Sequence, residues 1–493
     1  MRTFFILISK LPRLMWGLKR RLGKAQRAQQ PVAMLGTLRF AQPTTLAHPP
    51  ALIAGLALLA YWNAFAGSFQ FDDYKVIVDN PAVASLAAWW QSMPGIRPLL
   101  KFSYALNREL AHGDAGLFGF HAANLALHVG NALLLLGIAR RLLTGRENSG
   151  RVALLAALIF AVHPVHSEAV TMISGRSMAL MAFFYLGSLL AYLDQRRGWS
   201  LAAFAAALAV RETALTLPLA LLLVERLRTP DQPFRAALLR GGGHWLLAAL
   251  AASALLLLPY FRHLAAVSLA TRPPLDNLIT QSAAVLYLLR QWLWPLALDA
   301  DPLLPVFSHW NGFWLASTTL SIGLFIGALF AWRKAGGARW IGFGMLWFFL
   351  HLAPTNSLLP RLDVANERHL YLASAGLCLL AALWLTRSLQ TRPRLLAGVA
   401  SVLVLGLALT TLARNTVYRD EITFWTDITA KNPGNSRAYN NLGYALARSD
   451  RPAAAVAAYN QAIRLDPADF TSRLNRRALC RKAAAQCEKT DTP

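Results

Sequence analysis

Two adjacent acids, Asp72 and Asp73, follow an apolar stretch at residues 51–65 that is able to cross a bilayer. Acids are scarce in this chain of 493 residues, which has 24 Asp and Glu against 49 Lys and Arg. Carboxylates accept protons in general-base catalysis and bind cations. Because ionisable groups at membrane depth are costly, the pair indicates a functional site rather than a solvated loop end. If the backbone is extended there, the two side chains point opposite ways and only one reaches a given atom.

Other ionisable groups also interrupt apolar sequence. Arg211 and Glu212 lie between two short apolar segments, which favours a site over a surface loop. The segments HPVHSEAV at 163–170 and NERHLYL at 366–372 adjoin apolar segments in the same way.

A polar stripe also runs along one predicted helix. His121, Asn124 and His128 recur at spacings of three, four and seven, so they share one helical face. Such a stripe on an otherwise apolar helix predicts either a lined cavity or hydrogen bonds to a neighbouring helix.

The elements that position these residues are apolar helices. The chain is 56% hydrophobic and only 15% charged, which is too apolar for an ordinary soluble domain. Apolar segments recur from residue 50 to about 413, so we predict an all-α, polytopic membrane bundle. We place about eleven spans, at residues 50–66, 119–139, 152–164, 178–193, 199–210, 213–224, 244–260, 312–332, 340–353, 369–386 and 395–413. The segments 199–210 and 213–224 can also be drawn as one long helix, although the arginines on both flanks favour two crossings.

The net charge of +25 is concentrated in short loops between the apolar segments. This is the positive-inside pattern of a membrane protein, and it argues against a nucleic-acid partner. We place these loops in the cytoplasm, at residues 140–151, 195–198, 225–243, 333–339 and 387–394. An even number of crossings between them puts the polar groups described above, and the C-terminus, on the outer side. The apolar but Gln-containing segment 279–296 is predicted to lie flat or re-entrant on that side.

Two further parts flank the predicted membrane domain at 49–413. Residues 1–48 carry nine Lys or Arg and no acid, which predicts a basic cytoplasmic arm. In the tail, at 414–493, residues 436–469 fit one tetratricopeptide repeat, and 420–435 fit the second half of a preceding one. Fewer than three repeats are rarely stable alone, so the tail is expected to dock on the membrane domain or on a partner. It is then either a structural cap or a platform for a polypeptide.

Over most of residues 50–469 the chain resembles the transmembrane and tetratricopeptide-repeat O-mannosyltransferases and their bacterial relatives. The resemblance rests on FDDYKVIVDNPAV at 71–83, RPLLKFSYALN at 97–107, FHAANLALH at 120–128 and FAVHPVHSEAVTMISGRS at 160–177. It continues with RETALTLPL at 211–219, NERHLYLASAGLCLL at 366–380 and RDEITFWTDITAKNP before the repeat. There are departures: Met178 stands where the family often has Glu, Arg211 stands where Lys is usual, and the repeats are fewer.

The resemblance implies a membrane glycosyltransferase of fold C that moves a sugar from a polyprenyl-phosphate donor to a hydroxyl. A carboxylate would take the proton of that hydroxyl. The family pattern favours Asp72 as this base, with Asp73 orienting a partner or binding a cation. The leaving lipid phosphate needs cationic stabilisation, for which the candidates are Arg97, Arg176, Arg211 and Arg368, with Arg211 foremost. Glu212 and Glu367 complete the predicted binding set.

Two interpretations of His163, His166 and Glu168 stay open. They could hold a divalent cation, although Pro164 interrupts a regular helix and no strict ligand spacing is present. They could instead form a hydrogen-bonded wall for sugar and phosphate, together with the stripe on residues 121–128.

The expected cellular location is a bacterial inner membrane, with the reacting groups and the tail in the periplasm. The expected partners are a lipid-linked sugar, with mannose as a candidate, and a protein or glycan acceptor. We assign no residue as a metal ligand. A non-enzymatic assembly factor that recruits partners through the repeat is the alternative. A transporter is disfavoured, because no internal repeat with broken helices near the midplane is evident.

Overall fold

The computed structural model describes residues 48–93, 95–110 and 116–482. Within these ranges every regular element is helical, so the predicted all-α fold is confirmed. The predicted basic arm lies outside the described residues, apart from its last residue.

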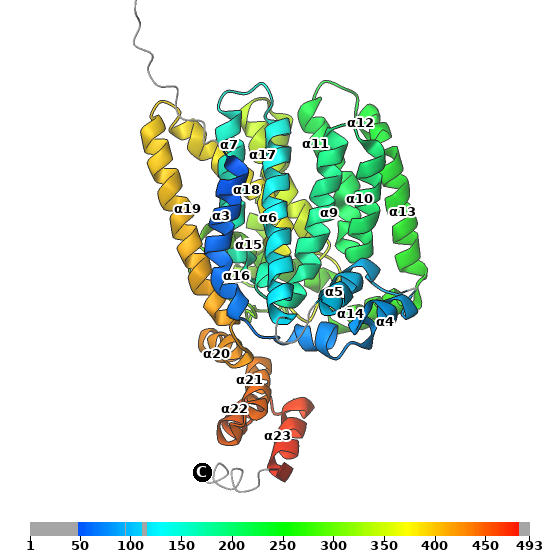
Figure 1. Ribbon diagram of the computed structural model, residues 1–493, viewed down its shortest axis with the longest axis vertical. Helices are drawn as coiled ribbons and strands as arrows, with labels where there is room; N and C mark the ends of the chain where they lie inside the picture. The colour runs from blue at the N-terminus through cyan, green and yellow to red at the C-terminus, as the bar shows by residue number, and fades with distance from the viewer. Residues whose placement is uncertain (1–47, 94, 111–115, 483–493) are drawn as a thin grey trace, which may run out of the picture. The chain divides into compact units, whose positions relative to one another are not determined.

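In the described residues, eleven helices run side by side in the bundle, and each overlaps one of the predicted apolar segments (Figure 1). They are α3 (Pro49–Tyr61), α6 (Gly116–Leu142), α7 (Ser149–Val162), α9 (Arg176–Leu193), α10 (Arg197–Val210), α11 (Leu217–Arg228), α13 (Gly242–Leu257), α16 (Gly312–Arg333), α17 (Gly337–Leu352), α18 (Leu370–Ser388) and α19 (Pro393–Asn415).

The crossing number of eleven is not confirmed. By length and apolar composition, six helices of the described part could cross a membrane, or up to eight if each of two bent helix pairs counts as one span. Several predicted spans form shorter helices, such as the 12-residue α11. The segment 199–224 forms two helices, because Arg211 adopts an extended backbone between them.

Further elements connect these helices. Before the tail, the other described α-helices are α4 (Leu86–Gln91), α5 (Pro98–Leu110), α8 (Ser167–Val170), α12 (Phe234–Arg240), α14 (Pro259–Thr271) and α15 (Pro274–Leu293). The tighter turns are η1 (Trp62–Ala66), η3 (Pro81–Val83), η5 (Pro164–His166), η6 (Ile173–Gly175), η7 (Glu212–Thr216), η8 (Glu367–His369) and η9 (Thr416–Tyr418), and η2 (Tyr74–Val78) is π-helical.

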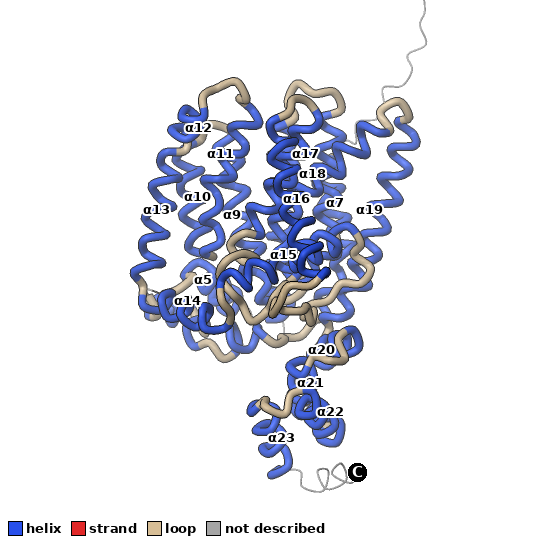
Figure 2. The backbone as a smooth tube through the Cα atoms, turned by 180° about the vertical axis from the view of Figure 1, so that it is seen from behind, coloured by secondary structure: helices blue, strands red, loops and turns tan. Residues whose placement is uncertain are grey.

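The two ends of the bundle differ. The basic loops between α6 and α7, between α11 and α13, and between α18 and α19 lie at one end (Figure 1, Figure 2). The opposite end carries α4, α5, α14, the longer irregular segments and the tail (Figure 1, Figure 2). The arrangement therefore gathers the positive charge of the loops at the end away from the tail.

The tail consists of α20 (Glu421–Lys431), α21 (Ser436–Arg448), α22 (Pro452–Leu465) and α23 (Phe470–Lys482). Asp420 caps the start of α20, and Asn435 caps the start of α21, by accepting hydrogen bonds from backbone N–H groups. Small residues allow close packing within the repeat: a Cβ on Gly443 would lie 2.7 Å from the Tyr459 ring.

The tail is docked on the membrane domain. Arg437 of α21 forms ion pairs with Asp301 and, at 2.7 Å, with Asp363, both in loops of the bundle. The side-chain amide of Asn432 bonds to the backbone carbonyl of Asp301 at 3.1 Å, and Lys431 donates to the carbonyl of Leu298 at 2.7 Å. This contact supplies the support that so short a repeat unit lacks alone.

Glycines permit one close helix crossing in the core. A Cβ on Gly376 of α18 would lie 2.7 Å from the carbonyl oxygen of Gly344 in α17 and 2.9 Å from the Trp347 Cβ. Backbones that approach this closely need small residues at the crossing, as is common between membrane helices.

We expect Gly376→Ala to lower the thermal stability of the detergent-solubilised protein, because overpacking against backbone costs about 1–3 kcal/mol. The matched control is Gly406→Ala in α19, where an added Cβ meets nothing within 4 Å. That change should be neutral or stabilising by up to about 1 kcal/mol, because alanine favours helix over glycine. Equal melting temperatures for the two variants would contradict the crossing.

Candidate functional site

The loop after the first span is held in place by Asp73. Its side chain is buried, and its two oxygens accept hydrogen bonds from the backbone N–H groups of Gln70 at 3.0 Å and Ser174 at 2.7 Å. This ties the loop to the turn before α9. Burial raises the pKa of Asp73 to about 6, against the lowering effect of the hydrogen bonds from Ser174 and Gln70.

Asp72 points the other way and is half exposed. Its carboxylate oxygen lies 3.2 Å from Nη1 of Arg368. The expectation that the two acids diverge is met, but the extended backbone assumed for it is wrong: both residues lie in a helical turn. Successive residues of a helix are about 100° apart around its axis, which also separates the side chains.

Arg368 lies between two carboxylates. Besides Asp72, it faces Glu168, with 3.4 Å between Arg368 Nε and Glu168 Oε1. Its backbone N–H also donates to Glu168 Oε2 at 2.9 Å and to the Asn366 side chain at 3.1 Å. Sequence segments around residues 72, 168 and 368 are thus brought to one point at the tail end of the bundle.

A small cleft opens at this point, and we call it the Asp72 cleft. Its walls include Phe71, Asp72, Glu168 and Arg368 from the bundle and Trp425 and Arg437 from the tail. Its volume of about 20 Å³ has room for about one water molecule, so a sugar can enter only if the walls separate.

A second group of charged side chains lies near Arg368. Arg97 binds Glu212 through two hydrogen bonds, of 3.1 Å and 2.6 Å. Although burial opposes it, the charges of Arg97 and Arg211 lower the pKa of Glu212 to about 2. Arg97 itself has a left-handed backbone, with φ of 52°, which is uncommon outside glycine.

Arg211 is buried, and no carboxylate of the described part of the chain forms an ion pair with it. Within the described residues its Nη1 donates a 3.0 Å hydrogen bond to the Ser177 hydroxyl, and its Nε has no hydrogen-bond partner. Burial and the nearby charge of Arg97 lower the pKa of Arg211 to about 9. Arg361 and Arg368 also act on Arg211 electrostatically. We call Arg97, Arg211, Arg361 and Arg368 the basic cluster, and their mutual repulsion would be relieved by a bound anion.

His369 adjoins the basic cluster and was not predicted. It is buried, and in the described part of the chain neither of its ring nitrogens has a hydrogen-bond partner. Such an orphaned group is rare in a folded protein and marks a place for a water or a ligand. The sequence signal was its position directly after Arg368.

The other predicted site residues are not brought to the cleft. His121, Asn124, His163, His166 and Arg176 are buried and bond to protein groups, chiefly backbone carbonyls. The Arg176 guanidinium donates to the carbonyls of Ser103 and Phe120 and to the side-chain oxygen of Asn124. It therefore joins α9 to α5 and α6. In this arrangement the polar stripe of α6 makes interhelical hydrogen bonds, and a substrate-binding role for it stays a prediction.

The cation interpretation gains no support. Within residues 48–93, 95–110 and 116–482, no group of three or more His, Cys, Asp or Glu side chains is placed to hold a metal ion. The His166 Nε2 instead lies 2.8 Å from the Ser374 hydroxyl, and Glu168 faces Arg368.

Glu367 lies behind the cleft rather than in it. It pairs with Arg414 of α19 at 3.3 Å, and Arg414 also contacts Asp427 of α20 at 3.2 Å. The sequence motif NERH therefore serves two purposes in the structure: Arg368 faces the cleft and Glu367 faces the joint between bundle and tail.

Comparisons with known proteins confirm the resemblance on which the expectations rest. Residues 436–469 match the tetratricopeptide repeat family. The chain is 27% identical to the mouse (Mus musculus) "Protein O-mannosyl-transferase TMTC4", over 83% of this chain and 65% of that protein. It is 26% identical to the Drosophila melanogaster "Protein O-mannosyl-transferase Tmtc3", over 85% and 55%. A shorter stretch, 29% of the chain, is 35% identical to the human (Homo sapiens) "Protein O-mannosyl-transferase TMTC1".

The chain spans less than two thirds of the length of these relatives. They are animal proteins, so they lend no support to the expected bacterial relatives. No solved structure is significantly similar to the chain.

We expect Asp73→Asn to destabilise the protein, because an amide has one accepting oxygen and would leave one buried N–H unpaired, at a cost of about 1–3 kcal/mol. Thermal unfolding of the solubilised protein measures this. The matched control is Asp72→Asn, which removes a half-exposed ion pair worth about 1 kcal/mol or less. Equal destabilisation by the two changes would contradict the anchoring role.

The destabilisation by Asp73→Asn should also depend on pH. The folded-state pKa of Asp73, about 6, lies above its ordinary value of 3.8, so the folded state holds this proton more tightly. Its contribution to stability is complete below about pH 4 and is lost as the pH rises through about 6. The deficit of the variant relative to wild type should therefore shrink between these pH values, and a deficit that grows would contradict the raised pKa.

Proposed function

We propose that this protein is a membrane glycosyltransferase that moves a sugar, mannose first among candidates, from a polyprenyl-phosphate donor to a Ser or Thr hydroxyl of a protein. The observation that carries the proposal is the half-exposed carboxylate of Asp72, held by Arg368 beside a basic cluster at the tail end of the bundle. The names of the relatives support the same reaction class and the same sugar.

In the proposed reaction, the acceptor oxygen forms a bond to the anomeric carbon of the sugar while the bond from that carbon to the phosphate oxygen breaks. The hydroxyl proton passes to Asp72, and the lipid phosphate leaves with the bonding electrons. Asp72 is suited to this because it lines the cleft and, among the described residues, accepts no backbone hydrogen bond, whereas Asp73 accepts two. Asp301 and Asp363 also line the cleft, but both are paired with Arg437 of the tail. Arg368 fixes the position of its carboxylate.

The basic cluster is the proposed site of the lipid phosphate. Arg97 has Glu212 as a counter-charge, whereas Arg211 has hydrogen-bonding capacity left over. Guanidinium groups bind phosphate oxygens in pairs, and a phosphate that gains charge as the sugar leaves is stabilised increasingly. Arg361, Arg368 and His369 lie within electrostatic reach of the same place.

We place the reaction on the membrane side opposite the basic loops, which is the outer side if those loops are cytoplasmic. For a bacterial cell this means an inner-membrane enzyme with a periplasmic site and tail. The alternative, a non-enzymatic assembly factor, would need the docked tail but not a carboxylate and uncompensated arginines at one point.

We expect Asp72→Asn to lower the transfer rate by about 10²–10⁴-fold with little loss of folded protein, because it keeps the shape and removes the base. Transfer from a polyprenyl-phosphate sugar by purified protein measures this. Asp231→Asn, an exposed acid in a basic loop at the other end, is the matched control and should stay active. Near-normal transfer by the Asp72 variant would favour the assembly factor or a different base.

We expect Arg211→Ala to lower kcat/KM for the lipid donor about 10- to 100-fold, because a charge-assisted hydrogen bond contributes about 1.5–3 kcal/mol. Kinetics with varied donor and varied acceptor test this. Ser177→Ala is the control, since it removes the partner hydroxyl of Arg211 and keeps the charge. If Arg211→Ala changed only the acceptor dependence, the phosphate role would be wrong.

A further inference from the structure

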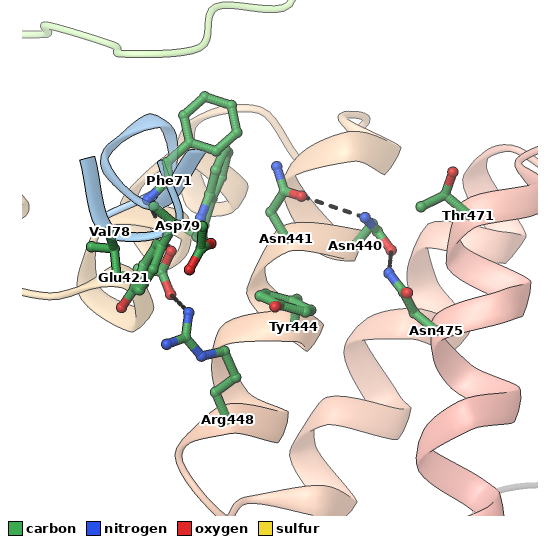
Figure 3. Close-up of a pocket in the computed structure, with 12 residues that line it drawn as sticks. Phe71, Val78, Asp79, Glu421, Asn440, Asn441, Tyr444, Arg448, Thr471 and Asn475 are labelled. Atoms are coloured by element: carbon green, nitrogen blue, oxygen red, sulfur yellow. Dashed lines mark hydrogen bonds and ion pairs between the residues drawn. The ribbon is translucent and has the colours of Figure 1, made fainter. Parts of the chain in front are cut away.

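A second, larger cavity lies between the first loop of the membrane domain and the tail, and we call it the tail groove. Its volume is about 560 Å³. Val78 and Asp79 of the loop line one side, Asn441 and Tyr444 of α21 line the floor, and Thr471 and Asn475 of α23 line the far side (Figure 3). The groove is therefore composite, because neither the bundle nor the repeat forms it alone.

Three asparagine side chains of α21 and α23 line the groove. Asn475 donates to the Asn440 oxygen at 3.0 Å, and Asn440 donates to the Asn441 oxygen at 3.4 Å (Figure 3). This chain of bonds orients the Asn441 amide, whose nitrogen has no hydrogen-bond partner in the described residues. An amide group offers both donor and acceptor, which matches the alternating N–H and C=O groups of a peptide backbone.

The charges of the groove exclude polyanions as the occupant. Asp79 and Glu421 line it, and Arg448 lies 3.9 Å from Glu421. A nucleic acid or an anionic lipid headgroup would need an excess of positive charge, which is absent from this lining.

The aromatic rings of the groove are also poorly placed for a sugar. The Arg448 guanidinium covers the Tyr74 ring at 4.1 Å, and the Trp425 ring meets Phe71 edge to face at 5.1 Å. Glycan sites use open ring faces for stacking, whereas the Arg448 guanidinium covers the Tyr74 ring and lies 5.8 Å from the centroid of the Tyr444 ring. An uncharged, extended polypeptide is the occupant that the lining fits best.

Phe71 and Trp425 form the wall between the tail groove and the Asp72 cleft, because both line each of them. Phe71 has a left-handed backbone, with φ of 42°, and its N–H donates to Glu421 of α20 at 2.9 Å. A bulky residue adopts this conformation only when its surroundings impose it, and such strain gathers at functional sites. Phe71 directly precedes Asp72, so this wall residue and the carboxylate share one backbone segment.

We infer that the tail groove binds the acceptor polypeptide in extended form and directs a hydroxyl side chain past Phe71 and Trp425 to Asp72. This rests on the proposed function for the transfer step, but the binding step can be measured without it. The tail is then both a docked structural part and the acceptor site.

The test measures binding to full-length Asp72→Asn protein, so that turnover does not interfere. The probe is a fluorescein-labelled synthetic peptide of Thr, Ala and Val residues, followed by fluorescence anisotropy. Replacing both Asn441 and Tyr444 by Ala should raise Kd at least about tenfold, since two lost contacts of about 1 kcal/mol each reach that size. Asn460→Ala, on α22 and outside the groove, is the matched control and should leave Kd unchanged.

Three results would overturn the inference: no binding of the peptide to the Asp72→Asn protein, an unchanged Kd in the double variant, or binding of a mannose oligosaccharide in place of the peptide.

The wall formed by Phe71 and Trp425 is tested in the otherwise wild-type enzyme. Phe71→Ala should lower transfer to the peptide while hydrolysis of the lipid donor by water persists; an equal loss of both would mean a merely structural role. If peptide binding behaves as expected but neither the wild-type protein nor any variant transfers sugar, the tail groove is a polypeptide-binding site and the proposed transferase function is wrong.

Discussion

The candidate site depends on Arg368, a largely buried arginine that lies between the carboxylates of Asp72 and Glu168. A buried cation without any partner would be strongly destabilising. The buried Glu168 carboxylate supplies that partner, and the partly exposed Asp72 carboxylate adds a second one. Glu168 comes from the broken segment after α7, and Asp72 comes from the loop after α3. The arginine therefore fixes three distant parts of the sequence at one end of the bundle, and the position of the proposed base follows from that constraint.

The same end of the bundle also holds the tail. Arg437 bridges Asp301 and Asp363 of two bundle loops, and Arg414 bridges Glu367 and Asp427. These two arginines join the repeat to the membrane domain close to the Asp72 cleft. A repeat unit too short to be stable alone thus becomes part of the site, and the cleft and the tail groove share the wall formed by Phe71 and Trp425.

The helices of the bundle could be predicted from the sequence, because each is a continuous apolar segment between polar or glycine-containing breaks. The number of crossings could not, because several of these helices are short. The polar stripe at residues 121–128 was correctly placed on one helix face, but a sequence does not distinguish a lined cavity from hydrogen bonds to a neighbouring helix. In the structure His128 bonds to Tyr371, 243 residues away. The pairs of Arg437 with Asp301 and Asp363 carry no local signal for the same reason: their partners are distant in the sequence.

The central claim is that a lipid-phosphate sugar binds at the tail end of the bundle, with its sugar at Asp72 and its phosphate on the basic cluster. A structure of the full-length Asp72→Asn protein with a bound polyprenyl-phosphate mannose tests this most directly. The account predicts the anomeric carbon beside residue 72 and phosphate oxygens within hydrogen-bond distance of Arg211 or Arg368. A phosphate bound among the basic loops at the opposite end, with the Asp72 cleft unchanged, would contradict it.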